Sequence, residues 1–194
     1  MYKSIDCTAL EFELKESLSE KRYRHCLAVA QSCLRLNERY SLHLDATELY
    51  AAALMHDMAR EWGREQLVDY ALANNLDLMS EERECPTLLH APVATSLLAG
   101  RGFSDQVCTA VRYHTLGSIH MGTMGLLVYI SDYLEPNRTH LCEQDRQRLL
   151  EHPTAEKLCL AILEQERAYL VAKAKQISAS GEELYRFLCS GGTF

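Results

Sequence analysis

DATELYAAALMHD, residues 45–57, is the stretch that decides the fold class of this chain. Asp45 and Glu48 have the spacing of a capping box, in which two side chains bond the free backbone groups of a helix's first turn. Leu49 and His56 lie on one face of such a helix, inside an almost wholly apolar run. The segment therefore predicts a helix that ends in a histidine-aspartate pair.

The rest of the chain repeats this helical pattern. Apolar residues recur at helical spacing, and no alternating run is followed by an Asn-Gly or Asp-Gly hairpin turn. The sequence therefore predicts an all-α fold. Ser17 and Glu20 have capping-box spacing and introduce a long helix to about Tyr40, and Ser104 can cap a helix that ends at His114. The other expected helices run from about Thr8, from Asp45 to the pair at 56–57, from Arg64 to Ala73, from Pro92 to Gly100, from Thr123 to Pro136, from Glu143 to Glu151, from Pro153 to Lys175, and from Ser180 onward.

Length and charge limit the organisation of the chain and its partners. A chain of 194 residues is within the range of one compact domain. We expect a single domain over residues 1–194, with a core at about 19–138 and helices within 143–190 packed on it. The formal charge of −7, with acidic and basic residues interleaved, offers no basic stripe for a nucleic-acid backbone. The composition therefore disfavours long DNA or RNA as a partner.

Cysteine usage and hydropathy indicate a compartment. The eight cysteines are scattered without a CxxC pair, and most fall at apolar positions of helical segments. We expect them to be reduced and buried rather than paired in disulfides. The first ten residues have no apolar core of signal-peptide length, and no stretch approaches the roughly 18 apolar residues of a membrane span. The expected location is cytoplasmic, without membrane attachment, which agrees with reduced thiols.

Several histidines and one aspartate occupy chemically notable positions. His25 lies early in an expected helix, His90 at the start of another and His114 at the end of a third. Helix ends converge readily on one pocket. Asp132 lies inside an apolar helix, where a charged carboxylate is costly to bury without a metal ion or a strong hydrogen-bonding partner. A cation bound between the helices would remove that cost.

These residue types indicate which metals the pocket would bind. Imidazoles and carboxylates without thiolates suit iron, manganese, zinc or cobalt in an open catalytic site. Successive helical residues point about 100° apart, so His56 and Asp57 can approach one ion only where the helix frays or at slightly different depths. If two ions bind, Asp57 is the natural bridge between them.

Five stretches around these residues form a specific combination. They are Lys21-Arg22-Tyr23-Arg24-His25, Leu54-Met55-His56-Asp57-Met58-Ala59-Arg60, His90-Ala91-Pro92-Val93-Ala94, Ala110-Val111-Arg112-Tyr113-His114-Thr115-Leu116-Gly117, and Tyr129-Ile130-Ser131-Asp132-Tyr133-Leu134-Glu135-Pro136-Asn137-Arg138. Together they resemble the HD superfamily of metal-dependent phosphohydrolases, and within it the YqeK-type branch, over about Ser19 to Tyr185. Members of that branch are bacterial hydrolases that split diadenosine tetraphosphate symmetrically into two ADP.

The resemblance implies an HD-domain helical bundle that binds one or two iron ions between its helices, with manganese, cobalt or zinc as substitutes. It assigns the metal to His25, His56, Asp57 and Asp132; catalytic roles to Asp57, His90, His114 and Arg60; substrate contacts to His25, Arg60, His90, His114, Thr115, Asp132 and Arg138; and more peripheral positions to Arg22, Gly117, Lys175 and Ile177. In this assignment His114 either contacts phosphate or holds a second metal.

The chain departs from the branch at four places, two of which are Ala91 in place of a glycine and His120 in place of a smaller or amide residue in the loop after His114. Arg60 stands where the branch usually has lysine, which keeps the charge and adds a planar fork suited to phosphate oxygens. Between Lys175 and Ser180 the expected proline and threonine are missing. Because this late segment looks like a nucleoside wall in the branch, the choice between adenine and guanine stays open. Arg22 either pairs with a nearby carboxylate and orients His25, or is a solvated surface charge.

The resulting functional prediction is hydrolysis of a phosphoanhydride by metal-activated water. Arg60, Arg138 and a protonated histidine would offset the charge on the phosphates. Two alternatives stay open: an HD nucleotidase or alarmone hydrolase acting on another nucleotide, and a regulatory module that binds nucleotide without turnover. The expected partner is a small nucleotide substrate, and a homodimer stays open.

Overall fold

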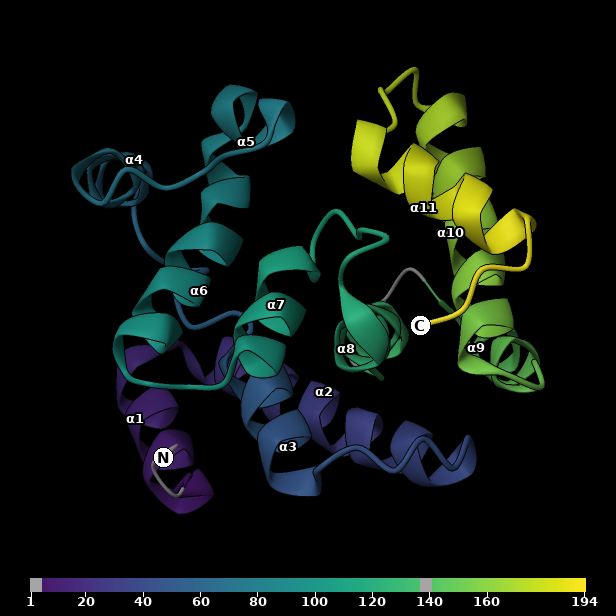
Figure 1. Ribbon diagram of the computed structural model, residues 1–194, viewed down its shortest axis with the longest axis horizontal. Helices are drawn as coiled ribbons and strands as arrows, with labels where there is room; N and C mark the ends of the chain where they lie inside the picture. Colours follow the sequence, from purple (N-terminus) through teal and green to yellow (C-terminus); the bar gives the residue numbers. More distant parts are fainter. Residues whose placement is uncertain (1–4, 137–140) are drawn as a thin grey trace.

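The computed structural model describes residues 5–136 and 141–194, and in these ranges the regular secondary structure is entirely helical. The all-α prediction is therefore confirmed. The α-helices are α1 (Cys7–Ser17), α2 (Glu20–Arg39), α3 (Ala46–Met55), α4 (Arg64–Ala73), α5 (Ser80–Glu84), α6 (His90–Gly100), α7 (Asp105–Tyr113), α8 (Gly122–Leu134), α9 (Glu143–Leu150), α10 (Ala155–Ala172) and α11 (Ala179–Cys189), with a 3₁₀ helix at Pro86–Leu89. In Figure 1, α4–α6 lie on one side, α9–α11 on the other, and α8 between them.

Helix α8 is the central element of the bundle. It packs against α2, α7 and α10, and its side chains Leu126, Leu127 and Ile130 are fully buried. Helix α2 also packs along α3, whose apolar run 51–55 is completely buried. Burial of each large aliphatic side chain contributes about 1.5–3 kcal/mol. This packing fixes the positions of the residues at the ends of α3 and α8 relative to the first turns of α2.

One cluster of buried apolar side chains extends from Leu10 in α1 to Leu188 in α11. Leu158 and Ile162 of α10 belong to it and are fully buried, and α10 packs on α8. The helices that follow residue 141 therefore share a core with the helices that precede it. The organisation as a single domain remains a prediction.

The start of α2 differs from the prediction. Ser17 is the last residue of α1, and its hydroxyl donates to the carbonyl oxygen of Glu13 at 2.8 Å. Ser19 is the N-cap of α2, because its Oγ accepts a hydrogen bond from the backbone N–H of Arg22 at 3.3 Å. The predicted pairing of Ser17 with Glu20 was therefore wrong. Sequence spacing alone does not distinguish two serines that lie two residues apart.

Two other helix starts follow the predicted capping residues. Asp45 Oδ1 accepts a hydrogen bond from the backbone N–H of Glu48 at 2.8 Å, at the start of α3. Ser104 Oγ accepts from the backbone N–H of Val107 at 3.3 Å, at the start of α7. Caps of this kind typically contribute about 1 kcal/mol. They set where α3 and α7 begin, and both helices end at histidines of the candidate site.

Helix α5 was not predicted, and α10 is shorter than predicted. The sequence of α5 is SEERE, which has no apolar periodicity. Its Glu82 is fully buried, and the carboxylate accepts hydrogen bonds from both Nη atoms of Arg112 at 2.5 and 2.9 Å. This contact with α7 holds α5 in place, together with a local bond in which the backbone N–H of Met79 donates to Glu82 Oε2 at 2.8 Å. Helix α10 ends at Ala172, three residues before the predicted end at Lys175.

The cysteines are all free, as expected, but only half of them are buried. Cys26, Cys33, Cys108 and Cys159 are buried, whereas Cys85, Cys142 and Cys189 are exposed and Cys7 is intermediate. Burial raises the pKa of the Cys33 thiol to about 12, so this side chain behaves as a small apolar group. None of the helices in the described ranges is both long and apolar enough to span a membrane.

Candidate metal centre

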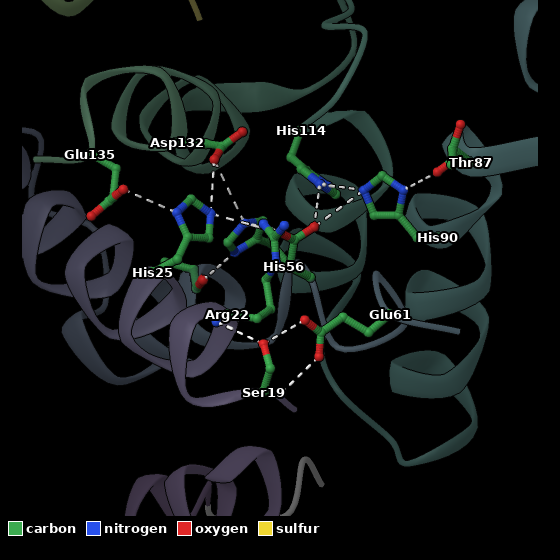
Figure 2. Close-up of polar contacts among 12 residues, drawn as sticks. Ser19, Arg22, His25, His56, Glu61, Thr87, His90, His114, Asp132 and Glu135 are labelled. Carbon is green, nitrogen blue, oxygen red and sulfur yellow. Dashed lines mark hydrogen bonds and ion pairs between the residues drawn. The ribbon is translucent and has the colours of Figure 1, made fainter. Parts of the chain in front are cut away.

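Six polar side chains from different helices meet in one group, which we call the His/Asp cluster (Figure 2). Its members are His25 in the second turn of α2, His56 and Asp57 directly after α3, His90 at the first residue of α6, His114 directly after α7, and Asp132 in the last turn of α8. Five of the six are buried, and the Asp132 side chain is 19% exposed. The cluster is therefore a largely enclosed site with one accessible carboxylate.

The adjacent residues His56 and Asp57 face the same centre because α3 ends before them. Helix α3 stops at Met55, and the next residues form turns in which the backbone N–H of Arg60 donates to the carbonyl oxygen of Asp57 at 2.9 Å. In a continuous helix the two side chains would point about 100° apart. In the turn, His56 Nε2 lies 3.5 Å from Asp57 Oδ2.

One side of the cluster is formed around Asp132. Its Oδ1 lies 3.0 Å from His25 Nε2 and 3.9 Å from His56 Nε2. Asp57 Oδ2 lies 3.6 Å from His25 Nε2. Ligand bonds of about 2.1 Å place neighbouring ligand atoms about 3–4 Å apart, so these separations fit a shared ion. His25, His56 and Asp132 together can hold a metal ion.

The other side of the cluster is formed around the second oxygen of Asp57. Asp57 Oδ1 lies 3.2 Å from His90 Nε2 and 3.6 Å from His114 Nε2. His56, Asp57 and His114 also form a group that can hold a metal ion. The Asp57 carboxylate therefore lies between two sets of imidazoles, with one oxygen toward each. This is the arrangement expected of a bridging ligand.

The imidazole rings of three histidines are oriented by backbone carbonyl oxygens. His56 Nδ1 lies 2.6 Å from the carbonyl oxygen of Ala53, and His90 Nδ1 lies 2.6 Å from that of Thr87. His114 Nδ1 lies 2.7 Å from the carbonyl oxygen of Val111. A carbonyl oxygen can only accept, so each Nδ1 carries the proton. The lone pair of each neutral ring is then on Nε2, which faces Asp57. Such outer hydrogen bonds are typical of metal-binding histidines.

Two buried ring nitrogens lack hydrogen-bond partners among the described residues, which bears on whether the site fits a metal ion. Nε2 of His25 and Nε2 of His56 make no hydrogen bond of acceptable geometry within the described chain. A buried polar atom left in this state costs about 1–3 kcal/mol. Both atoms lie beside carboxylate oxygens, which cannot donate to them when ionised. A divalent cation would satisfy all of these atoms, so the donor set fits a metal ion.

The electrostatics of the cluster keep the Asp57 carboxylate charged. Burial alone would raise the pKa of Asp57, but the imidazoles of His56, His114 and His90 around it hold that pKa well below its usual range. Burial would lower the pKa of His25, yet Asp132, Asp57 and Glu135 together raise it. Burial lowers the pKa of His90. The cluster therefore combines an ionised Asp57 with two imidazoles, His25 and His90, whose pKa values are shifted in opposite directions.

Arg22 and Glu61 connect the start of α2 to the turn after α3. Arg22 Nη1 donates to Asp57 Oδ2 at 2.7 Å. Ser19 donates to the Glu61 carboxylate twice, from its backbone N–H at 2.7 Å and from its hydroxyl at 2.6 Å (Figure 2). Of the two readings of Arg22, pairing with a nearby carboxylate is the one observed. The sequence reasoning missed Glu61, because a contact 42 residues away leaves no local signal.

The residues expected to contact substrate lie around the cluster. Arg60 is half-buried in the turn after Asp57. Thr115 Oγ1 is buried and makes no hydrogen bond with any described residue. Gly117 follows in the same loop, at a φ of 70°. Arg60 and Thr115 therefore lie within three residues of a cluster member along the chain.

Three further predicted residues lie outside the contacts described above. One of them, Arg138, lies outside the described residues, so its prediction stays a prediction. Lys175 is exposed and Ile177 is half-buried, in the segment between α10 and α11. Within the described ranges, no hydrogen bond or ion pair joins Lys175 to the His/Asp cluster.

Glu135 is a second residue that the sequence reasoning left without a role. It is 1% exposed, and its Oε2 lies 3.3 Å from His25 Nδ1. In the sequence it belongs to the stretch from Tyr129 to Arg138 that carries the resemblance. A glutamate just after an apolar helix and just before a proline could have been noticed as a carboxylate that is costly to bury.

The sequence of the chain is similar to that of known hydrolases. The HD domain family matches residues 22–163, which is most of the chain. A symmetrical bis(5'-nucleosyl)-tetraphosphatase of Staphylococcus aureus is 38% identical over 131 residues, 64% of this chain and 64% of that protein. The protein of the same name from Bacillus subtilis is 28% identical over 180 residues, 92% of this chain and 95% of that protein.

The fold comparison covers nearly the whole chain. A crystal structure from Clostridium acetobutylicum, described as a predicted HD superfamily hydrolase involved in NAD metabolism, has a TM-score of 0.84 and 24% identity. The match covers 97% of this chain and 100% of that one. At this identity the likeness concerns the fold. The family match over residues 22–163 shows that the chain belongs to the HD domain family.

Proposed function

We propose that the chain is a metal-dependent hydrolase that splits dinucleoside tetraphosphates, above all diadenosine tetraphosphate, symmetrically into two ADP. The observation that carries the proposal is the Asp57 carboxylate, whose two oxygens face two sets of imidazoles at 3.2–3.6 Å. The names of the Staphylococcus aureus and Bacillus subtilis relatives support the substrate and the symmetry of cleavage.

The proposed ligands divide into two groups. His25, His56, Asp57 and Asp132 would hold one ion, and Asp57, His90 and His114 would hold a second ion or contact phosphate. Iron is the proposed metal, and manganese, cobalt or zinc are substitutes that suit the same nitrogen and oxygen donors. When bound, such an ion lowers the pKa of water toward neutrality and polarises a phosphoryl oxygen.

In the proposed reaction the chain's own residues orient and neutralise the phosphates. Water adds to one of the two central phosphorus atoms, the central anhydride bond breaks, and each half leaves as ADP. Arg60 would bind equatorial phosphate oxygens, where charge accumulates as the bond breaks. Thr115 would donate its hydroxyl, which makes no hydrogen bond with any described residue, and Arg138 would add a second guanidinium. These groups supply local positive charge in a chain whose net charge is −7.

The remaining expectations belong to the same proposal. One domain over residues 1–194, a cytoplasmic location and a small nucleotide as substrate remain predictions. A homodimer also remains open. The segment between α10 and α11 contains Lys175 and Ile177. It stays the candidate for contact with the nucleoside, as the resemblance implies.

The test is anaerobic purification with elemental analysis, followed by chromatography of the products from diadenosine tetraphosphate. ADP as the sole product supports the proposal. Orthophosphate release from nucleoside monophosphates, or turnover of guanosine tetraphosphate alarmones instead, supports the alternative enzymes. Binding of nucleotide without turnover by the metal-loaded protein supports a regulatory module.

One variant links the metal to the activity. Asp57→Ala should lose both metal and activity while its circular dichroism keeps the wild-type helical content. Asp69→Ala, which changes an exposed carboxylate on α4, is the matched control and should keep both. Loss of metal with full activity retained would refute the proposed mechanism.

A further inference from the structure

Glu135 is a buried carboxylate directly behind a cluster histidine. It follows the last residue of α8 as its C-cap and is 1% exposed. Its Oε2 lies 3.3 Å from His25 Nδ1, while Nε2 on the other side of the same ring lies 3.0 Å from Asp132 Oδ1 (Figure 2). The His25 ring is thus placed between two carboxylates, one inside the His/Asp cluster and one outside it.

His25 differs from the other cluster histidines in what its Nδ1 contacts. His56, His90 and His114 each use the carbonyl oxygen of the residue three positions earlier. Those three histidines lie at helix ends, where the backbone allows this contact. His25 lies inside α2, where the preceding carbonyl oxygens accept hydrogen bonds from the helix itself. A partner for its Nδ1 must therefore come from another part of the chain.

We propose that Glu135 is a positioning residue that orients His25 and strengthens it as a metal ligand, an inference that rests on the metal centre of the proposed function. The carboxylate accepts the Nδ1–H of His25, which fixes the tautomer with the lone pair on Nε2. Its negative charge makes that lone pair a better donor than a neutral carbonyl oxygen would. His25 is then the one cluster histidine with an anionic outer partner among the described residues.

The backbone at Glu135 is held from α9, which fixes the position of its side chain. Arg146 is 8% exposed, and its Nε donates to the carbonyl oxygen of Leu134 at 2.7 Å. Its Nη2 donates to the carbonyl oxygen of Glu135 at 3.3 Å. These bonds satisfy carbonyl groups that the end of α8 leaves without helical partners. Arg146 thereby links α9 to the end of α8, directly beside the carboxylate that contacts His25.

A matched control exists on the same arginine. Arg146 Nη1 donates to Glu143 Oε2 at 2.8 Å, but the Glu143 side chain is 68% exposed. Glu143→Gln therefore changes a carboxylate beside Arg146 without touching His25. Glu135→Gln keeps a group that can accept from Nδ1–H and removes the charge, whereas Glu135→Ala removes both.

The experiment measures binding of Co²⁺ to the full chain by competition with a chelator, together with the visible absorption of the bound ion. Glu135→Ala should weaken binding about ten- to hundred-fold and change the absorption spectrum. Glu135→Gln should lose less affinity than Glu135→Ala, and Glu143→Gln should match the wild type. The melting temperatures of the metal-free proteins serve as the measure of folding.

Two outcomes would overturn the proposal. One is a Co²⁺ affinity for both Glu135 variants within about twofold of the wild type. The other is an affinity loss in Glu143→Gln equal to that in Glu135→Gln, because the effect would then be a general one of charge near Arg146. If Glu135→Ala does not fold, Glu135→Gln decides alone. Failure of wild-type turnover despite normal Co²⁺ binding would reject the proposed substrate and leave the affinity series valid.

Discussion

The Nε2 atoms of His90 and His114 face each other at 3.2 Å. Nδ1 of each ring is already bonded to a backbone carbonyl oxygen, at 2.6 Å for His90 and 2.7 Å for His114. A neutral imidazole with its proton on Nδ1 has only a lone pair on Nε2. The two facing atoms therefore repel each other unless a proton or a cation lies beside them. Asp57 Oδ1 lies 3.2 Å from His90 Nε2. The half of the cluster formed by His90, His114 and this oxygen therefore suits a second positive ion.

Replacing His114 tests whether that half holds its own metal. We expect the wild type to bind two ions per chain and His114→Ala to bind one, because His25, His56 and Asp132 stay on the other side of Asp57. Elemental analysis of protein dialysed with Mn²⁺ measures the ratio. His120→Ala is the control, since this exposed histidine lies in the following loop. One ion in both wild type and His114→Ala would show that His114 is not a metal ligand.

Replacing Arg60 tests whether its guanidinium binds phosphate rather than stabilising the cluster. None of the described residues forms an ion pair with Arg60, unlike Arg22, which binds Asp57. Loss of a charged hydrogen bond of about 1.5–3 kcal/mol corresponds to roughly a ten- to hundred-fold fall in kcat/KM. We expect this fall in Arg60→Ala with unchanged metal content, and a partial recovery in Arg60→Lys.

The control for this variant is Arg64→Ala at the exposed start of α4. Its kcat/KM should equal that of the wild type. Metal loss in Arg60→Ala would instead make Arg60 part of the support of the cluster.

The positions of most cluster residues could be predicted because helix ends carry local signals. Asp45 and Ser104 cap the starts of α3 and α7, and the ends of these two helices place His56 and His114. A polar residue inside the apolar helix α8 identified Asp132. In each case the energetic reason lies within a few residues of the side chain, so one sequence is enough to find it.

The outer supports of the cluster could not be predicted in the same way. Glu61 binds Ser19 from 42 residues away, and Glu135 reaches His25 from 110 residues away. The buried Glu82 likewise pairs with Arg112 of α7, which is 30 residues away. These contacts depend on how helices pack. The local pattern around Glu61 does not distinguish it from a solvated glutamate, and the position of Glu135 beside an apolar helix indicates burial but not its partner. Helix α5 was missed for the same reason.

Glu61 provides a prediction about the pH dependence of stability. Partial burial would raise the pKa of Glu61, but the two hydrogen bonds from Ser19 and the charge of Arg22 lower it below 4.5. A carboxyl group with a lowered pKa in the folded state stabilises the protein above its unfolded pKa. That contribution is lost as the pH falls through the lower folded value. Because Glu61 is exposed, we expect Glu61→Gln to cost only about 1 kcal/mol at pH 7.

Urea unfolding of metal-free protein at several pH values measures this effect. The difference in the free energy of unfolding between wild type and Glu61→Gln should be complete at pH 7, shrink below about pH 4.5, and vanish when Glu61 is protonated in both states. Glu183→Gln, an exposed change on α11, should show no such trend. A difference that stays constant down to pH 3 would mean that the Glu61 charge has no part in holding Ser19.

Gly117 lies in the loop after His114 and faces Leu184 of α11. Its backbone has a conformation that disfavours other residues. Its φ is 70°, and an added Cβ would lie 2.7 Å from Cδ2 of Leu184 and 3.5 Å from the Tyr129 ring. A left-handed conformation costs a non-glycine residue about 1–2 kcal/mol. Leu184 is fully buried, so it cannot move aside without disturbing its neighbours.

We therefore expect Gly117→Ala to lower the free energy of unfolding by about 2–3 kcal/mol and to lower kcat/KM, because the loop begins at His114. Gly102→Ala separates the two causes, since Gly102 has a φ of 84° with no atom within 4 Å of an added Cβ. It should lose about 1–2 kcal/mol and keep full activity. Denaturant unfolding and steady-state kinetics of both variants measure these effects. Equal destabilisation by the two substitutions would mean that the contact with Leu184 contributes nothing and that backbone conformation alone requires glycine at position 117.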